Sequence, residues 1–465
     1  MEQIIIDKFR KSIHGQLILP GDEDYDEVRK VWNGMIDKHP ALIVRCTDEA
    51  DVIAAVNFAR TQELLVAVRG GGHNVAGFGT CDEGIVIDLS PMKKIEVDTV
   101  NRTARAEPGL TWGEFDQATQ VHKLATTGGL VSTTGIAGFT LGGGFGWLVR
   151  KYGLAVDNLL SVNMVLANGQ KINAGPSENA ELFWGVRGGG GNFGVVTSFR
   201  YQLHDVGHMV FGGAFFYTAE KAIELLRFYR DWTPEMSDEL TTMVAFITAP
   251  PEPFIPKELV GTPMIVLALC YTGPVSQGEE VIEALRSATK PDIEHVGPVP
   301  YLALQTMFDD TAPNGIHSYW KTEYFGNLND DTINVLVEQA TKMKELSHFS
   351  AVHLHHWGGA IDCVDKNRTA FTNRNAPYVL NVIGQWNDPE SADKHIAWTR
   401  NFSRAMQAYS TGQKYLNFMG DEDRSRVKAA YDPITYERLV ALKNKYDPTN
   451  FFRLNQNIEL TANGA

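Results

Sequence analysis

The sequence predicts an α+β protein with a glycine-rich cofactor domain at its N-terminus and a second domain inserted before a short C-terminal segment. Up to about residue 205, clusters of glycine follow short apolar runs. From about 206 to 410 these clusters thin out, and apolar runs typical of strands alternate with amphipathic helices. The remaining tail contains Tyr-Leu-Asn-Phe at 415–418 and Asn-Gln-Asn at 455–457.

Local patterns predict the elements of the first part. Apolar positions recur with helical spacing over 49–62. Thr111 and Glu114 have the spacing of a capping box, which predicts a helix that continues to about Leu124. Asn168 and Gly169 lie between two apolar runs and predict a hairpin. Strands are predicted at 64–69, 84–90, 95–98, 103–106 and 195–203.

Longer elements are predicted in the second part of the chain. The apolar runs predict strands at 262–271, 351–357 and 378–386. Helical spacing of apolar residues predicts helices at 219–232, 330–346 and 391–409. The proline-rich stretch 249–256 is predicted to be a loop.

The composition excludes several classes of protein. With 43% hydrophobic and 21% charged residues over 465 positions, the chain is folded rather than disordered and can form two or three domains. Its net charge of −14 disfavours nucleic acid as a partner. No apolar run approaches the ~20 residues of a membrane span, so no membrane association is expected. The N-terminus has no signal-peptide pattern, which predicts a cytoplasmic protein whose Cys46, Cys81, Cys270 and Cys363 are reduced thiols.

Three segments concentrate glycine, at 69–77, 135–146 and 187–194. Consecutive glycines let backbone N–H groups approach an anion and face it. Each segment alone could be a tight turn at the end of a strand. Three of them beside predicted strands favour a large cofactor that carries phosphate.

The third segment matches the motif G-x-G-x-x-G at Gly189, Gly191 and Gly194. A nicotinamide-dinucleotide unit requires a helix directly after this motif. The residues that follow alternate as in a strand, so this interpretation fails. A Walker loop is excluded as well, because no Gly-Lys-Ser/Thr follows any of the clusters.

The chain carries four motifs in order: Arg-Gly-Gly-Gly-His-Asn at 69–74, Gly-Ile-Ala-Gly-Phe-Thr-Leu-Gly-Gly-Gly-Phe-Gly at 135–146, Asn-Phe-Gly-Val-Val at 192–196 and Asn-Gln-Asn-Ile at 455–458. This series resembles the FAD-linked oxidases of the vanillyl-alcohol oxidase superfamily, and most of all the berberine-bridge-enzyme-like branch. The resemblance implies a two-lobed FAD-binding fold of the PCMH type. It predicts an FAD-binding domain at 1–205, completed by the C-terminal segment 411–465. An inserted antiparallel-sheet substrate domain is predicted at 206–410.

The resemblance implies that His73 is joined covalently to the 8α-methyl group of the flavin. A neutral imidazole is a suitable nucleophile for this bond, although His73 could instead only form a hydrogen bond in a turn. The cysteine that makes a second link in many relatives is replaced by Val131, so a single link is expected. The other cofactor contacts that the resemblance implies are Arg69, Gly70, Gly71, Gly72, Asn74, Gly77, Thr134, Gly135, Gly138, Gly142, Gly143, Gly194, Val196, Asn417 and Asn455.

Hydride removal from a CH–OH or CH–N carbon needs a base, and a tyrosine, a glutamate or a histidine could serve. In the resembling family the segment that corresponds to 415–418 lies beside the flavin ring. Tyr415 is therefore the candidate base or substrate-orienting residue, with a packed core tyrosine as the alternative. Phe418 stands where relatives have a second tyrosine, and Asn417 remains able to bind the cofactor.

Substrate contacts are predicted on the inserted domain. Strand alternation places His353, His355 and Trp357 on one face, and Tyr324 belongs to a second polar and aromatic cluster at 320–324. Two histidines could bind zinc, but no third ligand is evident, so no metal is predicted. Aromatic residues over a flavin suit a flat or ring-shaped substrate.

The expected function is hydride transfer from a small molecule to covalently bound FAD, which dioxygen then reoxidises with formation of hydrogen peroxide. The resemblance implies a sugar, an alkaloid or a phenolic or polyketide metabolite as the substrate. Thr134 stands where relatives often have valine, near the route of oxygen to the flavin. Two alternatives therefore remain open: a dehydrogenase with another electron acceptor, and a flavin-carrying binding protein without turnover. A homodimer is a possible assembly.

Overall fold

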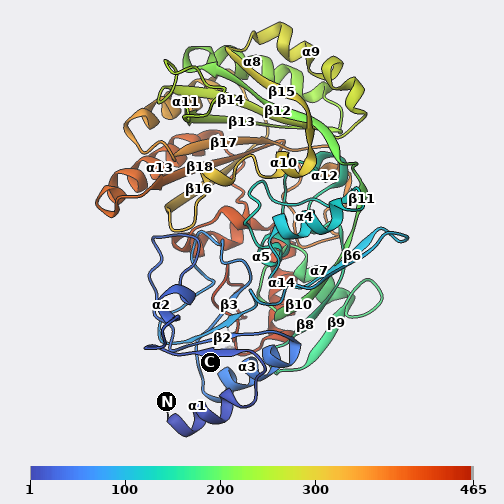
Figure 1. Ribbon diagram of the computed structural model, residues 1–465, viewed down its shortest axis with the longest axis vertical. Coiled ribbons are helices and arrows are strands. Elements are labelled where there is room, and N and C mark those ends of the chain that lie inside the picture. Colours follow the sequence, from blue (N-terminus) through green and yellow to red (C-terminus); the bar gives the residue numbers. More distant parts are fainter. Residues whose placement is uncertain (1, 462–465) are drawn as a thin grey trace.

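The computed structural model describes residues 2–461, without the side chains of 422–425, and stacks two parts along its longest axis (Figure 1). The lower part in this view contains a four-stranded and a five-stranded sheet, whose strands lie between residues 16 and 202, together with the last helix. A separate two-stranded sheet pairs Leu124–Ala125 with His204–Asp205. The upper part contains one large sheet whose strands lie between 209 and 386. This is the mixed helix and sheet architecture that the sequence predicts.

A four-stranded sheet lies nearest the N-terminus, in the order β1-β2-β4-β3. Strands β2, β4 and β3 are parallel, and β1 pairs with β2 antiparallel. Ile85 and Ile87 of β4 pack with α3 on one face, while Val86 packs with Ile43 and Ala67 on the other. Burial on both faces explains why these strands are continuous apolar runs in the sequence. The elements are α1 (Gln3–Arg10), β1 (Gln16–Ile18), α2 (Tyr25–Val28), β2 (Leu42–Arg45), α3 (Glu49–Thr61), β3 (Val66–Arg69) and β4 (Ile85–Asp88).

The second sheet is antiparallel, in the order β5-β6-β10-β8-β9, and includes the hairpin predicted at Asn168 and Gly169. The predicted capping box is present, because Thr111 and Glu114 each accept a hydrogen bond from the other's backbone N–H. The helix ends at Gln120 rather than near Leu124, since Lys123 adopts φ 63° and the chain then enters β7. The elements are β5 (Ile95–Asp98), β6 (Thr103–Ala106), α4 (Trp112–Gln120), β7 (Leu124–Ala125), α5 (Ile136–Leu141), α6 (Val149–Tyr152), β8 (Leu159–Val165), β9 (Lys171–Ala174), α7 (Ala180–Val186), β10 (Val195–Gln202), β11 (His204–Asp205) and α14 (Pro433–Tyr446).

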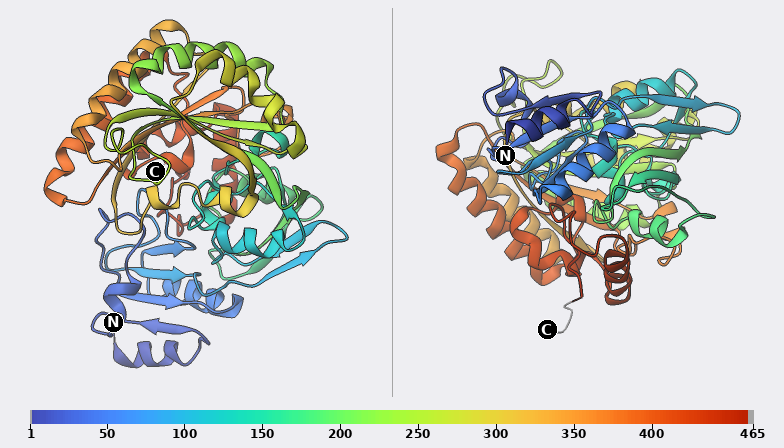
Figure 2. Two further views of the ribbon diagram at one scale, coloured as in Figure 1. Left: turned by 45° about the horizontal axis from the view of Figure 1, so that its top comes forward. Right: turned by 90° about the horizontal axis from the view of Figure 1, so that it is seen from below.

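The upper part is a seven-stranded antiparallel sheet in the order β15-β12-β14-β13-β17-β18-β16. Its outer face is covered by α8, α9, α11 and α13, which arch over the strands in the left view of Figure 2. Alternation along β13 sends Val244 and Phe246 toward these helices and Met243 and Ala245 to the opposite face. The elements are β12 (Met209–Thr218), α8 (Ala222–Trp232), β13 (Leu240–Thr248), β14 (Pro263–Tyr271), α9 (Gly278–Thr289), β15 (Ile293–Pro300), α10 (Tyr301–Gln305), β16 (His317–Phe325), α11 (Asp330–Thr341), β17 (Ala351–His356), α12 (Ala360–Cys363), β18 (Tyr378–Trp386) and α13 (Ala392–Met406).

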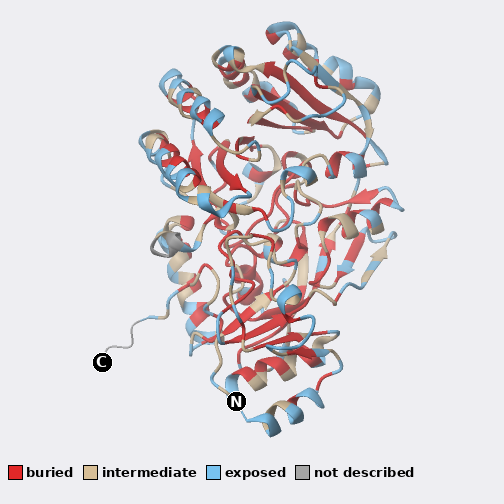
Figure 3. Ribbon diagram, turned by 60° about the vertical axis from the view of Figure 1, so that its left-hand side comes forward, coloured by how far each residue is buried: buried red, intermediate tan, exposed pale blue. Residues whose placement is uncertain are grey.

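Buried arginines hold the two parts together. Arg374, just before β18, donates two hydrogen bonds to Asp157 at 2.7 and 2.9 Å. Arg150 of α6 donates to the carbonyl oxygens of Trp357 at 2.6 Å and Leu240 at 2.9 Å. The inner face of the large sheet is therefore held against the lower part, where Figure 3 shows mostly buried chain.

All four cysteines are free, as the sequence predicts. Over the residues that the structure describes, no helix has the length and apolar character needed to cross a membrane.

Candidate active site

A cavity of about 1110 Å³ is lined by both parts of the molecule. One side, which we call the glycine wall, consists of the lining residues within 69–79, 129–145 and 190–196. The other side, which we call the sheet wall, consists of the lining residues of β12 to β18 and of 303–312. The volume exceeds the roughly 300–1,000 Å³ of most ligand pockets, which suits a cofactor and a substrate together.

The glycine wall is built from backbone in close contact. A Cβ atom on Gly71 would lie 2.6 Å from the Cα of Gly135, so these two glycine-rich segments touch directly. Gly72 adopts φ 68°, which a side chain would disfavour. Within the described chain, the backbone N–H groups of 71–74 have no hydrogen-bond acceptor. Such a row of free N–H groups beside a left-handed glycine is suited to bind an anion such as a pyrophosphate.

His73 projects from this wall with its reactive atoms available. Its imidazole stacks on the indole of Trp32, with ring centroids 4.3 Å apart and planes 15° apart. The Nε2 atom is buried and has no partner in the described chain. Burial lowers the pKa of His73 to about 4, so the ring is neutral at pH 7 and keeps a free lone pair. Those are the properties that a covalent link to a flavin requires.

Most of the predicted cofactor contacts line the cavity, but some have a different structural role. The guanidinium of Arg69 is buried in an ion pair with Asp88 at 2.9 Å. Gly77 does not line the cavity, and a Cβ there would lie 2.7 Å from Ile36. Gly143 also lies off the cavity and adopts φ 124°. In the structure these two glycines serve backbone conformation and packing, and their contact with the cofactor stays a prediction.

Residues of the C-terminal tail form hydrogen bonds with the third glycine-rich segment. The amide of Asn192 donates to the carbonyls of Gly189 at 2.8 Å and Gln456 at 3.0 Å. Asn455 donates to the carbonyl of Gly191 at 3.3 Å, and its Oδ1 is buried without a partner in the described chain. Because buried polar atoms normally have a hydrogen-bond partner, we expect this oxygen to accept a hydrogen bond from a group bound in the cavity.

The turn at 415–418 lies between the two walls. The hydroxyl of Tyr415 accepts hydrogen bonds from the Gly144 N–H at 3.0 Å and the Asn417 amide at 3.1 Å. Burial raises the pKa of Tyr415, which opposes the ionised form that a base would need. Asn417 also donates to the carbonyl of Phe139 at 3.0 Å and lines the cavity. Phe418 lines the cavity too, with its ring 5.6 Å from that of Trp320.

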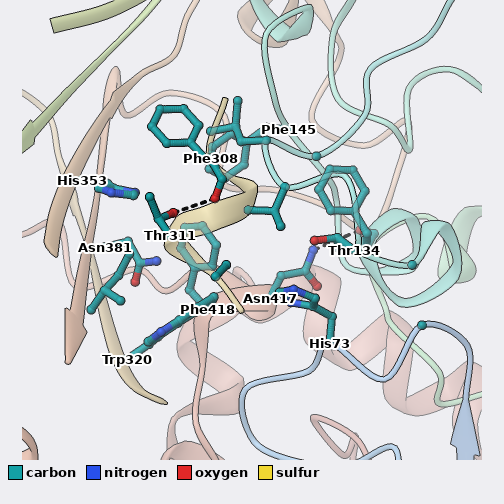
Figure 4. Close-up of a pocket in the computed structure, with 18 of the residues that line it drawn as sticks. His73, Thr134, Phe145, Phe308, Thr311, Trp320, His353, Asn381, Asn417 and Phe418 are labelled. Carbon is teal, nitrogen blue, oxygen red and sulfur yellow. Dashed lines mark hydrogen bonds between the residues drawn. The ribbon is translucent and has the colours of Figure 1, made fainter. Parts of the chain in front are cut away.

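The sheet wall presents neutral polar groups among aromatic rings. Figure 4 shows His353, Asn381 and Trp320 on the side opposite His73 and Thr134. His353 and Asn381 are directly paired across β17 and β18. The Oδ1 of Asn381 and the Nε1 of Trp320 are buried without partners in the described chain. Burial lowers the pKa of His353 to about 4, so this imidazole is neutral as well.

Only two of the four predicted substrate contacts reach the cavity. His353 and His355 line it, as strand alternation predicts. Trp357 and Tyr324 are fully buried behind the wall, where their rings pack at 5.5 Å. Trp357 follows the end of β17, so alternation no longer sets its direction. Neither Trp357 nor Tyr324 lines the cavity, and their contact with a substrate stays a prediction.

Several cavity residues were not identified from the sequence. Asn381 carried no motif, although the strand at 378–386 was predicted. Phe308 and Thr311 belong to a connection after α10, and Phe145 lies at the end of the second glycine-rich segment. Trp32, which stacks on His73 from outside the cavity lining, was not identified either, because its role depends on contacts with residues distant in the sequence.

The charge of the cavity is nearly neutral. Among the described lining residues, Arg69 is the only arginine or lysine, and Asp88 already neutralises it. The lining carboxylates, Glu252 and Asp310, are exposed. The cavity therefore offers no free cation to hold an anionic substrate.

Comparison with known proteins agrees with this site. Residues 40–175 match the family "FAD binding domain", and 414–459 match "Berberine and berberine like". An FAD-linked oxidoreductase of Dictyostelium discoideum is 33% identical over 99% of this chain and 98% of its own length. The (R)-6-hydroxynicotine oxidase of Paenarthrobacter nicotinovorans is 29% identical over 96% and 97% of the two chains. The crystal structure of 6-hydroxy-D-nicotine oxidase from Arthrobacter nicotinovorans superposes with a TM-score of 0.86, at 27% identity, and covers 96% of this chain and 98% of that one.

The fold, the glycine wall and these relatives define an FAD-linked oxidoreductase. Within this class, the chain belongs to the berberine-bridge-enzyme-like family of the vanillyl-alcohol oxidase superfamily. The site residues fit the cofactor, since free backbone N–H groups and unpartnered buried acceptors line a cavity of sufficient size.

Proposed function

We propose that the protein oxidises a CH–OH or CH–N carbon of a small molecule, using FAD that is linked once, through His73, with dioxygen as the electron acceptor. The observation that carries this proposal is the neutral imidazole of His73 at the glycine wall, whose buried Nε2 has no partner in the described chain. When bound, FAD supplies the acceptor for the hydride and passes the electrons on. Val131 lines the same cavity and has no nucleophile for a second link.

The chain itself would hold the cofactor mainly with backbone. The N–H groups of 71–74 would bind the pyrophosphate, and Gly70, Gly135, Gly138, Gly142, Gly194 and Val196 would allow close approach of the flat rings. Asn417 and Asn455 would bind it with their amides. This division corresponds to an FAD-binding domain at 1–205 with 411–465 and a substrate domain at 206–410.

We assign the proton-accepting role to His353 and an orienting role to Tyr415. His353 is neutral above pH 4 and faces the cavity from the sheet wall. Asn381, directly beside it, offers an unpaired oxygen that can accept a hydrogen bond from a substrate hydroxyl or amine. Tyr415 has a raised pKa and accepts two hydrogen bonds, so it can position a neighbour more readily than it can ionise.

Flat, uncharged or cationic ring compounds fit the cavity best. Aromatic faces and edges come from both walls and from the turn between them, at Trp320, Phe308, Phe145 and Phe418, and no free cation lines the cavity among the described residues. The name (R)-6-hydroxynicotine oxidase describes a relative that acts on a ring compound containing nitrogen. Alkaloids and phenolic metabolites are therefore the first substrates to test, ahead of sugars.

Acid precipitation tests the covalent link between His73 and FAD. The full-length protein is purified with its flavin, precipitated with acid, and the yellow colour is located. We expect the colour in the pellet for the wild type and in the supernatant for His73→Ala. Colour in the wild-type supernatant would show that FAD is bound without the link. A colourless protein that FAD cannot reconstitute would contradict the assignment of FAD as its cofactor and favour a binding protein without turnover.

A dehydrogenase is the second candidate function, because Thr134 lines the cavity where many relatives carry valine. Anaerobic reduction followed by mixing with air separates the two. Reoxidation within seconds supports the oxidase, and a reduced flavin that is stable in air for minutes supports the dehydrogenase. We also propose a cytoplasmic location. A homodimer is the proposed assembly, and size-exclusion chromatography with light scattering tests it.

A further inference from the structure

The orientation of the His73 ring depends on a residue that lies outside the cavity. Trp32 is 2% exposed and, among the described residues, is not part of the cavity lining. Its indole covers one face of the His73 imidazole, at 4.3 Å and 15°. Because the Nε2 of His73 has no partner in the described chain, that atom does not fix the ring. Two contacts then limit rotation of the imidazole: a hydrogen bond to the backbone of His73 itself and the stacking of the Trp32 indole.

Trp32 is itself anchored through its backbone and its ring. Its N–H donates to the carbonyl of Gly72 at 3.1 Å, directly beside His73. Its indole Nε1 donates to the carbonyl of Ala312 at 2.9 Å, and its carbonyl accepts from Gly315 at 2.9 Å. Trp32 thus joins the loop of His73 to the chain that leads into β16.

Asn33 also connects the loop that contains His73 to β16. Asn33 is 1% exposed and donates to the carbonyls of Val75 at 2.8 Å and Ser318 at 2.9 Å. It also accepts from the Ser318 N–H at 3.0 Å. Trp320, which lines the cavity, meets the Trp32 ring edge-on at 5.6 Å. The indole is therefore held by both parts of the molecule.

We infer that Trp32 is the positioning residue for covalent attachment of the flavin to His73; the inference rests on the proposed link. In this reaction one C–H bond of the flavin methyl group breaks, and one N–C bond to the imidazole forms as the ring N–H proton leaves. The two electrons reduce the flavin ring system, and dioxygen then takes up these electrons with the two protons released from the methyl group and the imidazole to give hydrogen peroxide. The indole keeps the imidazole plane and its lone pair directed into the cavity, and its cover contributes to the burial that keeps the ring neutral.

The test measures link formation rather than turnover. Full-length protein is produced under riboflavin limitation and mixed with FAD in air, and the acid-stable flavin fraction is followed with time. Misplacing a reacting group by about 1 Å costs on the order of 100-fold in rate, so we expect Trp32→Ala to form the link roughly 10- to 100-fold more slowly. Trp32→Phe keeps an aromatic face and should restore most of the rate. Trp398→Phe, on α13 away from the cavity, is the control for losing a buried indole.

Every outcome bears on the inference. Normal FAD affinity with slow linkage in Trp32→Ala, rescued by Trp32→Phe, supports it. If Trp32→Ala does not fold, Trp32→Leu fills the space without an aromatic face, and linkage as fast as in Trp32→Phe would overturn it. Wild-type rates in all variants overturn the role of Trp32 but leave the His73 link standing. A wild type that never forms the link overturns both.

Discussion

The two walls of the cavity are built from different parts of the polypeptide. The glycine wall exposes backbone, and Gly71 and Gly135 meet there at a distance that excludes any side chain. The sheet wall exposes side chains, chosen by strand alternation and by pairing such as that of His353 with Asn381. A wall of backbone suits a cofactor that is the same throughout a family. A wall of side chains can change with each substrate while the sheet remains unchanged.

The largest expected effect concerns the sheet wall. His353→Gln removes the neutral imidazole and should lower kcat/KM by about 10²- to 10⁴-fold with unchanged FAD content. Because the base must be neutral, wild-type kcat/KM should fall as pH drops through about 4, and this limb should disappear in the variant. Steady-state kinetics over pH with an accepted substrate measure both. His356→Gln, on the same strand but not lining the cavity, is the control, and an equal loss there would refute the role.

The second prediction concerns a buried ion pair that connects the turn at 415–418 to β16 of the large sheet. Lys414, next to Tyr415, forms an ion pair with Glu323 of β16 at 2.6 Å, and both are almost fully buried. Lys414→Met would leave the carboxylate without this partner and should lower the free energy of unfolding by about 3–5 kcal/mol. Urea unfolding measures the change. A loss below about 1 kcal/mol, the range of an exposed pair, would show that this ion pair contributes little to the stability of the contact between the turn and β16.

The third prediction probes the glycine wall. Gly71→Ala would place its Cβ 2.6 Å from Gly135 and should cost about 1–3 kcal/mol, with weaker FAD binding. Gly326→Ala is the matched control, because no heavy atom lies within 4 Å of a Cβ built there. Differential scanning fluorimetry with and without added FAD compares the two variants. Equal behaviour would show that the two segments can separate freely.

The last prediction is a dependence of stability on pH, to which both parts of the molecule contribute. Burial lowers the pKa of His353 and His395 to about 4 and that of His356 to about 3 in the upper part, and that of His73 and His204 to about 4 in the lower part. The unfolded chain binds these protons near pH 6.5, so it holds more protons than the folded chain between pH 6.5 and 4. Stability should therefore fall as pH drops through this range. Melting curves at stepwise pH should show this fall, and it should be shallower in His353→Gln; a flat profile would contradict the buried, neutral state.

The sequence by itself determined the class of fold, most elements and the glycine wall. Glycine allows two backbone segments to approach as closely as Gly71 and Gly135 do, so its clusters indicated the side of the cavity built from backbone. Strand alternation was sufficient to place His353 and His355, because they lie within β17. It did not hold for Trp357, which follows the last residue of that strand.

Only the tertiary structure decided which side chains share the cavity and which support it. Asn381 faces His353 because β17 and β18 pair in one register. Trp32 reaches His73 because the chain before β16 returns to the N-terminal loop with Ala312 and Gly315. The pKa values of Tyr415 and His73 shift through burial, which depends on everything packed around them. Contacts between residues tens to hundreds of positions apart leave no local pattern, and for this reason the sequence could indicate the cofactor but not the residues that orient its attachment.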